Sequence, residues 1–180
     1  MRYMLLTPRR ALFPLAAFLF LAAAAPAQAP PAGKLTTVIF IRHAERGPDE
    51  GFSSPIIAKG RQRARKLAHV LASSGITRIF VSEYVRTRQT VEPLARDLNI
   101  EPVEVAQKNG IDQLAARLTA TVRENPGQTI LVCSHRGRVE ALIEKLGGEK
   151  ITPLADPDYD SLFILTIPDS GPPKLLTLKY

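Results

Sequence analysis

The stretch Leu35-Thr36-Thr37-Val38-Ile39-Phe40-Ile41-Arg42-His43-Ala44-Glu45 decides the fold class of this chain. Its first seven residues are apolar or β-branched, which predicts a buried β-strand. The strand ends on an arginine and a histidine placed side by side, which suit an anion better than a hydrophobic core. In α/β folds ligands bind at the carboxyl ends of strands, so this position predicts an anion site.

Strand and helix patterns alternate through the rest of the chain. Apolar residues at helical spacing predict helices over 58–73, 87–98, 111–124 and 138–146. Short apolar runs predict strands over 38–41, 78–81, 102–105, 129–133, 161–167 and 174–179. This alternation predicts a three-layer α/β/α sandwich with a central, mostly parallel sheet and an antiparallel edge strand.

The first 29 residues have the pattern of a secretory signal peptide. Arg2, Arg9 and Arg10 precede an uncharged run over 11–25, and small residues follow with a cleavage pattern near 27–29. The run of 15 residues is shorter than the ~20 that span a bilayer, although an uncleaved anchor remains the alternative. We therefore expect a signal peptide (1–29), a tether (30–34) and a single domain (35–180), in a secreted or periplasmic protein that has no membrane contact after cleavage.

Composition narrows the class of partner. Loss of three basic residues with the signal leaves 21 basic against 17 acidic residues, a net charge of +4, which suits an anionic substrate. The chain has no Trp and no basic run paired with aromatics, so nucleic acid is not indicated. Cys133 is the only cysteine, which excludes an internal disulfide and a cysteine zinc site, and its apolar strand predicts a buried side chain.

Polar residues of one chemical kind follow three of the predicted strands. These strand ends carry Arg42-His43-Ala44-Glu45, the pattern Ser82-x-x-x-Arg86-Thr87-x-Gln89-Thr90, and Ser134-His135. In this order and spacing they resemble the histidine phosphatase superfamily, also called phosphoglycerate mutase-like, and specifically its compact branch 1. The resemblance covers essentially the whole chain after the signal.

The resemblance implies a phosphatase that works through a phosphohistidine. His43 would be the nucleophile, Arg42 and Arg86 would grip the phosphoryl oxygens, and His135 would stabilise the transition state. The family's site implies no metal and no cofactor, because arginine and histidine supply the positive charge. A small phosphorylated molecule or a phosphoprotein is the expected substrate.

The general acid that would protonate the leaving group is not identified by the sequence. The segment after the third predicted strand, where larger relatives carry a glutamate, is short, and the candidates are Glu83, Asp49, Glu50, Glu104 and Asp112. Lack of an acid would favour leaving groups that need little protonation, such as those of phosphohistidine, acyl and aryl phosphates.

Further arginines lie near the motifs. Arg46 and Arg136 are possible additional phosphate contacts, Arg136 being equally compatible with a solvated side chain. The basic residues Arg61, Arg63, Arg65 and Lys66 are interpreted as a solvated helix face. Two other functions stay open at this point: a phosphomutase on the same site, and a non-catalytic module that only binds phosphate.

Overall fold

The computed structural model describes residues 33–48 and 51–180. The predicted signal peptide (1–29) and most of the predicted tether (30–34) lie outside the described residues and stay predictions. None of the helices within the two described ranges is long and apolar enough to cross a membrane.

One mixed sheet of six strands forms the centre of the fold. The strands are β1 (Leu35–Arg42), β2 (Ile76–Val81), β3 (Val103–Glu104), β4 (Thr129–Ser134), β5 (Ser161–Pro168) and β6 (Lys174–Lys179). Their order is β3-β2-β4-β1-β5-β6. The first four run parallel, β5 is antiparallel to β1, and β6 is an antiparallel edge. The mostly parallel sheet with an edge strand in antiparallel pairing is confirmed. Since β6 is antiparallel to β5, it points the same way as the first four strands, and β5 runs against the other five described strands.

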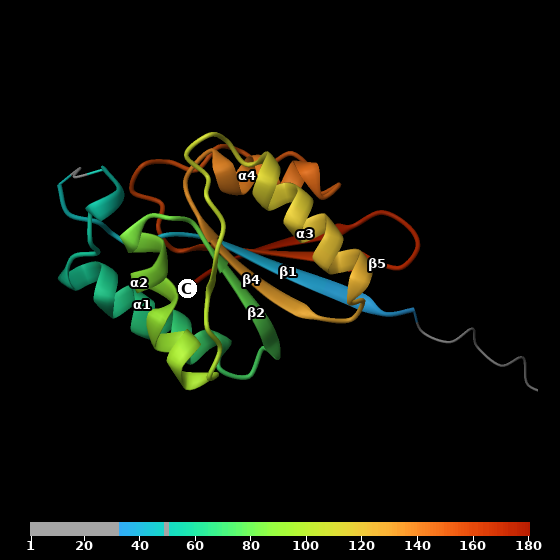
Figure 1. Cartoon of the computed structure of the whole chain (residues 1–180), viewed down its shortest axis with the longest axis horizontal. Coiled ribbons are helices and arrows are strands. Elements are labelled where there is room, and N and C mark those ends of the chain that lie inside the picture. The colour runs from blue at the N-terminus through green and yellow to red at the C-terminus, as the bar shows by residue number, and fades with distance from the viewer. Residues whose placement is uncertain (1–32, 49–50) are drawn as a thin grey trace, which may run out of the picture. The chain divides into compact units, whose positions relative to one another are not determined.

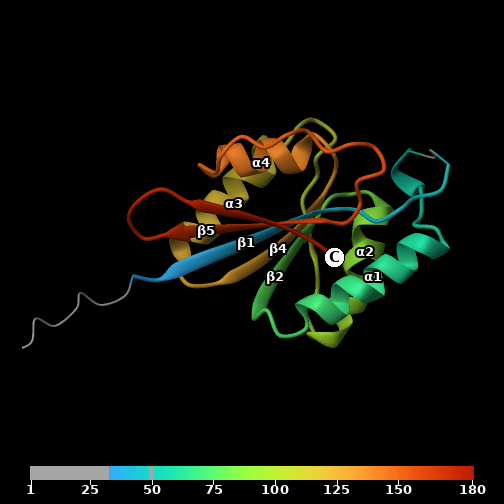
Figure 2. The same cartoon turned by 180° about the vertical axis from the view of Figure 1, so that it is seen from behind.

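Helices cover both faces of this sheet. They are α1 (Ala58–Leu71), α2 (Val85–Asp97), α3 (Asp112–Glu124) and α4 (Arg138–Lys145), with a short 3-10 turn, η1 (Gly51–Ser53). Figures 1 and 2 show α1 and α2 on one face and α3 and α4 on the other.

Strand β1 shows why two helical layers form. Its side chains alternate between the faces, so Val38 and Phe40 pack in the core under α3 and α4, whereas Ile39 and Ile41 pack in the core under α1 and α2. A strand that is apolar on both faces must be covered on both, which is the physical basis of the confirmed three-layer sandwich.

Two boundaries differ from the predicted ones near the strand ends. Helix α2 begins at Val85, two residues earlier than expected, because the backbone N–H of Thr87 donates to Tyr84 O at 3.0 Å and closes a turn there. Arg86 therefore lies in the first helical turn and is buried. The predicted strand 102–105 is reduced to two residues, which pair only with the end of β2.

Candidate active site

The two motif histidines meet at the carboxyl ends of β1 and β4. These strands pair in parallel with Arg42 opposite Ser134, and the backbone N–H of His43 donates to Ser134 O at 3.0 Å. The continuation of each strand by one residue brings the ring centroids of His43 and His135 to 5.3 Å. The sheet thus unites residues that are far apart in the sequence.

The His43 ring is held in one tautomer. Its Nδ1 lies 2.8 Å from Ala44 O, and since a carbonyl only accepts, Nδ1 carries the proton and Nε2 carries the lone pair. The backbone N–H of Ala44 in turn donates to Thr90 Oγ1 at 2.9 Å, which ties the turn to α2. Burial, reinforced by the charges of nearby arginines and opposed by the Ala44 hydrogen bond, lowers the pKa of His43 to about 3. The imidazole is therefore neutral and nucleophilic at physiological pH.

His135 is also buried and neutral. Its Nε2 lies 2.9 Å from Ser82 Oγ, and the Tyr84 ring packs edge-on against it with centroids 4.6 Å apart. Burial first, and then the neighbouring His43 and the arginines, lowers the pKa of His135 to about 2. No hydrogen-bond partner of its Nδ1 is found among residues 33–48 and 51–180, so this nitrogen is available to a ligand.

The histidines open onto a pocket of about 290 Å³ that is rich in arginine. Its described lining residues are Arg42, His43, Arg46, Tyr84, Arg86, His135, Arg136, Arg138 and Asp156. Both histidines are neutral, so the charged groups among these described lining residues are five arginines and one aspartate. All six residues predicted to be catalytic or to bind phosphate are therefore brought together, and Arg138, Tyr84 and Asp156 join them.

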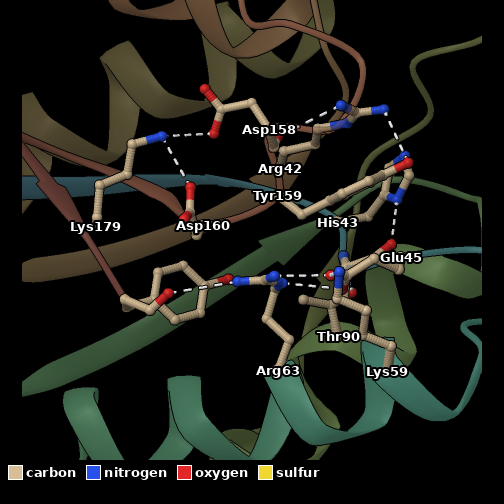
Figure 3. Close-up of polar contacts among 12 residues, drawn as sticks. Arg42, His43, Glu45, Lys59, Arg63, Thr90, Asp158, Tyr159, Asp160 and Lys179 are labelled. Carbon is tan, nitrogen blue, oxygen red and sulfur yellow. Dashed lines mark hydrogen bonds and ion pairs between the residues drawn. The ribbon is translucent and has the colours of Figure 1, made fainter.

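The guanidinium of Arg42 is already engaged by the protein. Its Nη1 donates to the carbonyl oxygens of Ala155 and Asp156 at 3.1 and 2.7 Å, and its Nη2 donates to Asp156 Oδ1 at 3.2 Å. It also stacks over Tyr159 at 4.1 Å from the ring centroid, beside His43 (Figure 3). Arg42 was expected to grip phosphate, and in this structure it anchors the loop 155–159 at the pocket rim.

Arg86 also lines the pocket, and the protein holds its side chain in place. Its side chain is buried, its Nη1 donates to Gly51 O at 3.0 Å, and its guanidinium lies 4.1 Å from the centroid of Tyr84. Arg46 and Arg136 line the pocket as expected, Arg136 with an exposed side chain. A neutral nucleophile among such cations is suited to a substrate that carries a compact negative charge.

None of the described acid candidates lines this pocket. Glu83 accepts the backbone N–H of Gln107 at 2.8 Å, Asp112 pairs with Lys145 at 2.8 Å, and Glu104 is exposed on β3. Asp49 and Glu50 lie outside the described residues.

The carboxylate that does reach the pocket, Asp156, was missed by sequence analysis. The hydrogen bond from Arg42, aided by the charge of Arg136, lowers its pKa, so it is ionised near neutral pH. The signal that could have found it is the polar loop before β5. That loop becomes meaningful only once β5 is known to run antiparallel to β1, because this pairing places the start of β5 beside the end of β1.

Arg138 was also missed. It is the first residue of α4, and its Nη1 is buried with no hydrogen-bond partner among residues 33–48 and 51–180. The sequence did contain a sign of its role, because Arg138 lies three residues after His135 at the start of a predicted helix. The helix dipole disfavours a cation at that position unless an anion binds there.

Glu45 completes the opening motif without reaching the pocket. Its carboxylate accepts two hydrogen bonds from Arg63, one from Nη2 at 2.7 Å and one from Nε at 2.9 Å. Lys59 Nζ lies 3.6 Å from Glu45 Oε1 (Figure 3). Burial alone would raise the pKa of Glu45, but the Arg63 hydrogen bonds and charge outweigh it and lower that pKa. The interpretation of Arg63 as part of a solvated helix face is wrong, because its side chain is only 17% exposed.

No cluster of three or more His, Cys, Asp or Glu side chains that could hold a metal ion occurs within the described ranges. Cys133 is fully buried in β4, as its apolar strand predicted, and burial raises the pKa of its thiol.

Comparisons with known proteins agree with this geometry. The family model described as histidine phosphatase superfamily (branch 1) matches residues 38–112. The 8-oxo-(d)GTP phosphatase of Mycolicibacterium smegmatis is 29% identical over 118 residues, which are 60% of this chain and 36% of that protein. The chain thus spans about a third of the length of this curated relative.

Solved structures share the fold at low sequence identity. The protein histidine phosphatase SixA complexed with tungstate superposes with a TM-score of 0.64 at 22% identity, covering 79% of this chain and 96% of that one. The phosphoserine phosphatase of Entamoeba histolytica superposes with a TM-score of 0.61 at 17% identity, covering 81% and 97%.

Proposed function

We infer that this chain belongs to branch 1 of the histidine phosphatase superfamily. On this basis we propose that it hydrolyses phosphate esters or related phosphoryl compounds through a phosphohistidine on His43. The observation that carries the proposal is the state of His43. Its proton is held on Nδ1 by Ala44 O, and its nucleophilic Nε2 belongs to a neutral ring at the wall of an arginine-rich pocket.

The reaction has two displacements. The lone pair of His43 Nε2 attacks phosphorus, and the bond from phosphorus to the leaving atom breaks, with its electron pair staying on that atom, which is the oxygen of an ester or acyl phosphate or the nitrogen of a phosphohistidine. Water then attacks the phosphorus of the phosphohistidine, its proton passes to solvent, and the P–N bond breaks with its electron pair returning to His43 Nε2. Inorganic phosphate leaves and the His43 lone pair is restored.

Arg86 and His135 are the side chains best placed to stabilise the transferred group. Arginine supplies a permanent charge and a fork of donors that matches phosphoryl oxygens. His135 is neutral in the empty pocket, and a bound phosphate dianion favours its protonated form, because opposite charges raise the pKa of a histidine. Arg42 contributes its charge from the pocket wall, and its buried Nε has no hydrogen-bond partner among the described residues.

The need of the leaving group for a proton restricts which classes of substrate fit this pocket. The only described carboxylate in the pocket, Asp156, is ionised and bound to Arg42, so it is a poor proton donor. This supports substrates whose leaving group needs little protonation, namely phosphohistidine, acyl phosphates or aryl phosphates. A phosphohistidine of a protein agrees with the similarity to the protein histidine phosphatase SixA. A small anionic phosphorylated molecule agrees with the similarity to 8-oxo-(d)GTP phosphatase.

We also propose that the chain is exported, on the signal pattern over 1–29. Export predicts that the protein recovered from the periplasm or medium starts directly after residue 27 or 29. Recovery of the full-length chain in the cytoplasmic fraction would reject this part of the proposal.

Hydrolysis of p-nitrophenyl phosphate, an aryl phosphate, tests the chemistry. We expect His43→Ala to reduce kcat at least about a thousandfold, as for loss of a nucleophile, and His69→Ala, on the exposed face of α1, to change nothing. An acid-labile phosphate on His43 after rapid quenching identifies the intermediate and excludes a module that only binds. Conversion of a phosphorylated substrate to its positional isomer, without release of inorganic phosphate, would indicate a mutase. Undiminished hydrolysis by His43→Ala would sink the proposal.

A further inference from the structure

We propose that Arg136 and Arg138 form a subsite for a second phosphate group, so that the preferred substrate carries two phosphates close together. The inference rests on the proposed function of the pocket and deepens it by naming a substrate class.

Arg138 is the first observation. Its Nη1 is buried and has no hydrogen-bond partner among the described residues, although the side chain lines the catalytic pocket. Leaving a buried charged donor unpaired is costly, and buried polar groups in native proteins nearly always have partners. The cation also sits in the first turn of α4, where the helix dipole disfavours it. A bound anion removes both penalties.

Arg136 is the second observation. It lies two residues before Arg138 across Gly137, whose φ of +75° forms the turn into α4. Its side chain is exposed and still lines the same pocket. The charge of Arg136 also contributes to the lowered pKa of Asp156, which lines the same pocket. The turn therefore presents two guanidinium groups to one opening.

The arginines of the pocket are not equivalent. Five arginines and one aspartate line it among the described residues. Arg42 is occupied by the loop 155–159, and Arg86 donates to Gly51 O beside the histidines. Arg136 and Arg138, which share the turn into α4, are the pair that we assign to an additional group.

The size of the pocket permits this arrangement. Its volume of about 290 Å³ is well above the ~10–15 Å³ that a cavity needs to hold one water molecule. That is enough for two phosphate groups in adjacent positions. Diphosphates and vicinal bisphosphates share this chemistry.

A matched pair of inert probes tests the subsite without turnover. Calorimetry compares methylenediphosphonate, whose bridge cannot be hydrolysed, with methylphosphonate, both in metal-free buffer. We expect the wild type to bind the diphosphonate at least about tenfold more tightly, as one added charge-assisted contact requires. Arg136→Gln and Arg138→Gln should each remove most of this preference, while Arg117→Gln, exposed on α3, should keep it.

Two results would overturn the subsite. One is equal affinity of the wild type for the two probes, and the other is an unchanged ratio in both variants. Because Arg136 is exposed, its substitution remains informative even if Arg138→Gln fails to fold. Kinetics with a diphosphate and with a vicinal bisphosphate then distinguish the two sources. The two proposals can fail separately. If hydrolysis of p-nitrophenyl phosphate depends on His43 but the wild type binds the two probes equally well, the subsite is rejected and the proposed function is kept.

Discussion

The carboxylate of Glu45 and the guanidinium of Arg63 form a two-point pair, at 2.7 and 2.9 Å, only two residues after His43. Arg63 also reaches Tyr180 O at 3.4 Å, so one arginine of α1 joins the end of the β1 motif to the segment after β6. The motif at the end of β1 therefore contains a histidine that lines the pocket and a carboxylate that holds the motif against the helix layer.

Glu45→Ala should destabilise the protein by about 2 kcal/mol, because it leaves the partly buried Arg63 without its charged acceptor. Urea unfolding measures the change. Arg65→Ala, on the exposed side of the same helix, serves as the matched control and should leave stability within about 0.5 kcal/mol. Equal effects of the two substitutions would show that the pair contributes nothing.

Gly60→Ala should also disturb this junction. A Cβ at position 60 would overlap the carbonyl oxygen of Glu45 and lie 3.0 Å from Ile56 Cβ. Alanine normally favours a helix over glycine by about 1 kcal/mol, so a net loss of about 1–3 kcal/mol would identify the clash. Thermal unfolding with Gly33→Ala as control, where the added Cβ meets only ordinary contacts, measures it. A more stable Gly60→Ala protein would contradict the close approach.

We expect the activity of the protein, measured as kcat/KM, not to fall near pH 6.5, where a histidine with an ordinary pKa would become protonated. Burial lowers the pKa of His43 to about 3 and that of His135 to about 2. Between pH 7 and 5 we therefore expect kcat/KM to show no loss from protonation of either ring. NMR titration of the imidazole C–H signals of His43 and His135 gives an independent check. A His43 signal that titrates near pH 6.5 would contradict the buried neutral state.

Stability should depend on pH through the same two groups. Below pH 6.5 the unfolded chain binds protons that the folded histidines do not, so the free energy of unfolding falls as the pH is lowered from 6.5 toward 3. The slope reaches at most about 1.4 kcal/mol per pH unit for each histidine. Chemical unfolding of His135→Asn at several pH values measures it. An equally steep slope in this variant and in the wild type would rule out the contribution of His135.

Asp156→Asn should strengthen the binding of inorganic phosphate several-fold at low salt. The substitution removes the one described carboxylate of the pocket and releases Nη2 of Arg42 from its ion pair. Calorimetry in low and high salt checks this, because screening should shrink the gain. Asp169→Asn, which lies outside this pocket, provides the control. Weaker phosphate binding by Asp156→Asn would mean that the carboxylate itself helps to hold the ligand.

Local patterns were sufficient for most of the fold and for the centre of the site. Residue alternation in β1 and helical spacing in α1 to α4 depend on near neighbours in the chain, so they can be interpreted without a structure. The same holds for His43, Arg86 and His135, because parallel strands end at one edge of a sheet. Motifs at those ends must converge, whatever the loops between them do.

Tertiary structure alone decided what surrounds that centre. Asp156 reaches Arg42 across 114 residues because β5 runs antiparallel to β1, and nothing in the local sequence specifies that pairing. Arg63 turned from a surface residue into the partner of Glu45 only when α1 packed against the end of β1. Long-range packing sets which charges are paired and which remain for a ligand. The sequence by itself therefore determined where the pocket lies, at the strand ends that carry His43 and His135, and only the folded chain decided which arginines pair with the protein's own carboxylates and carbonyls.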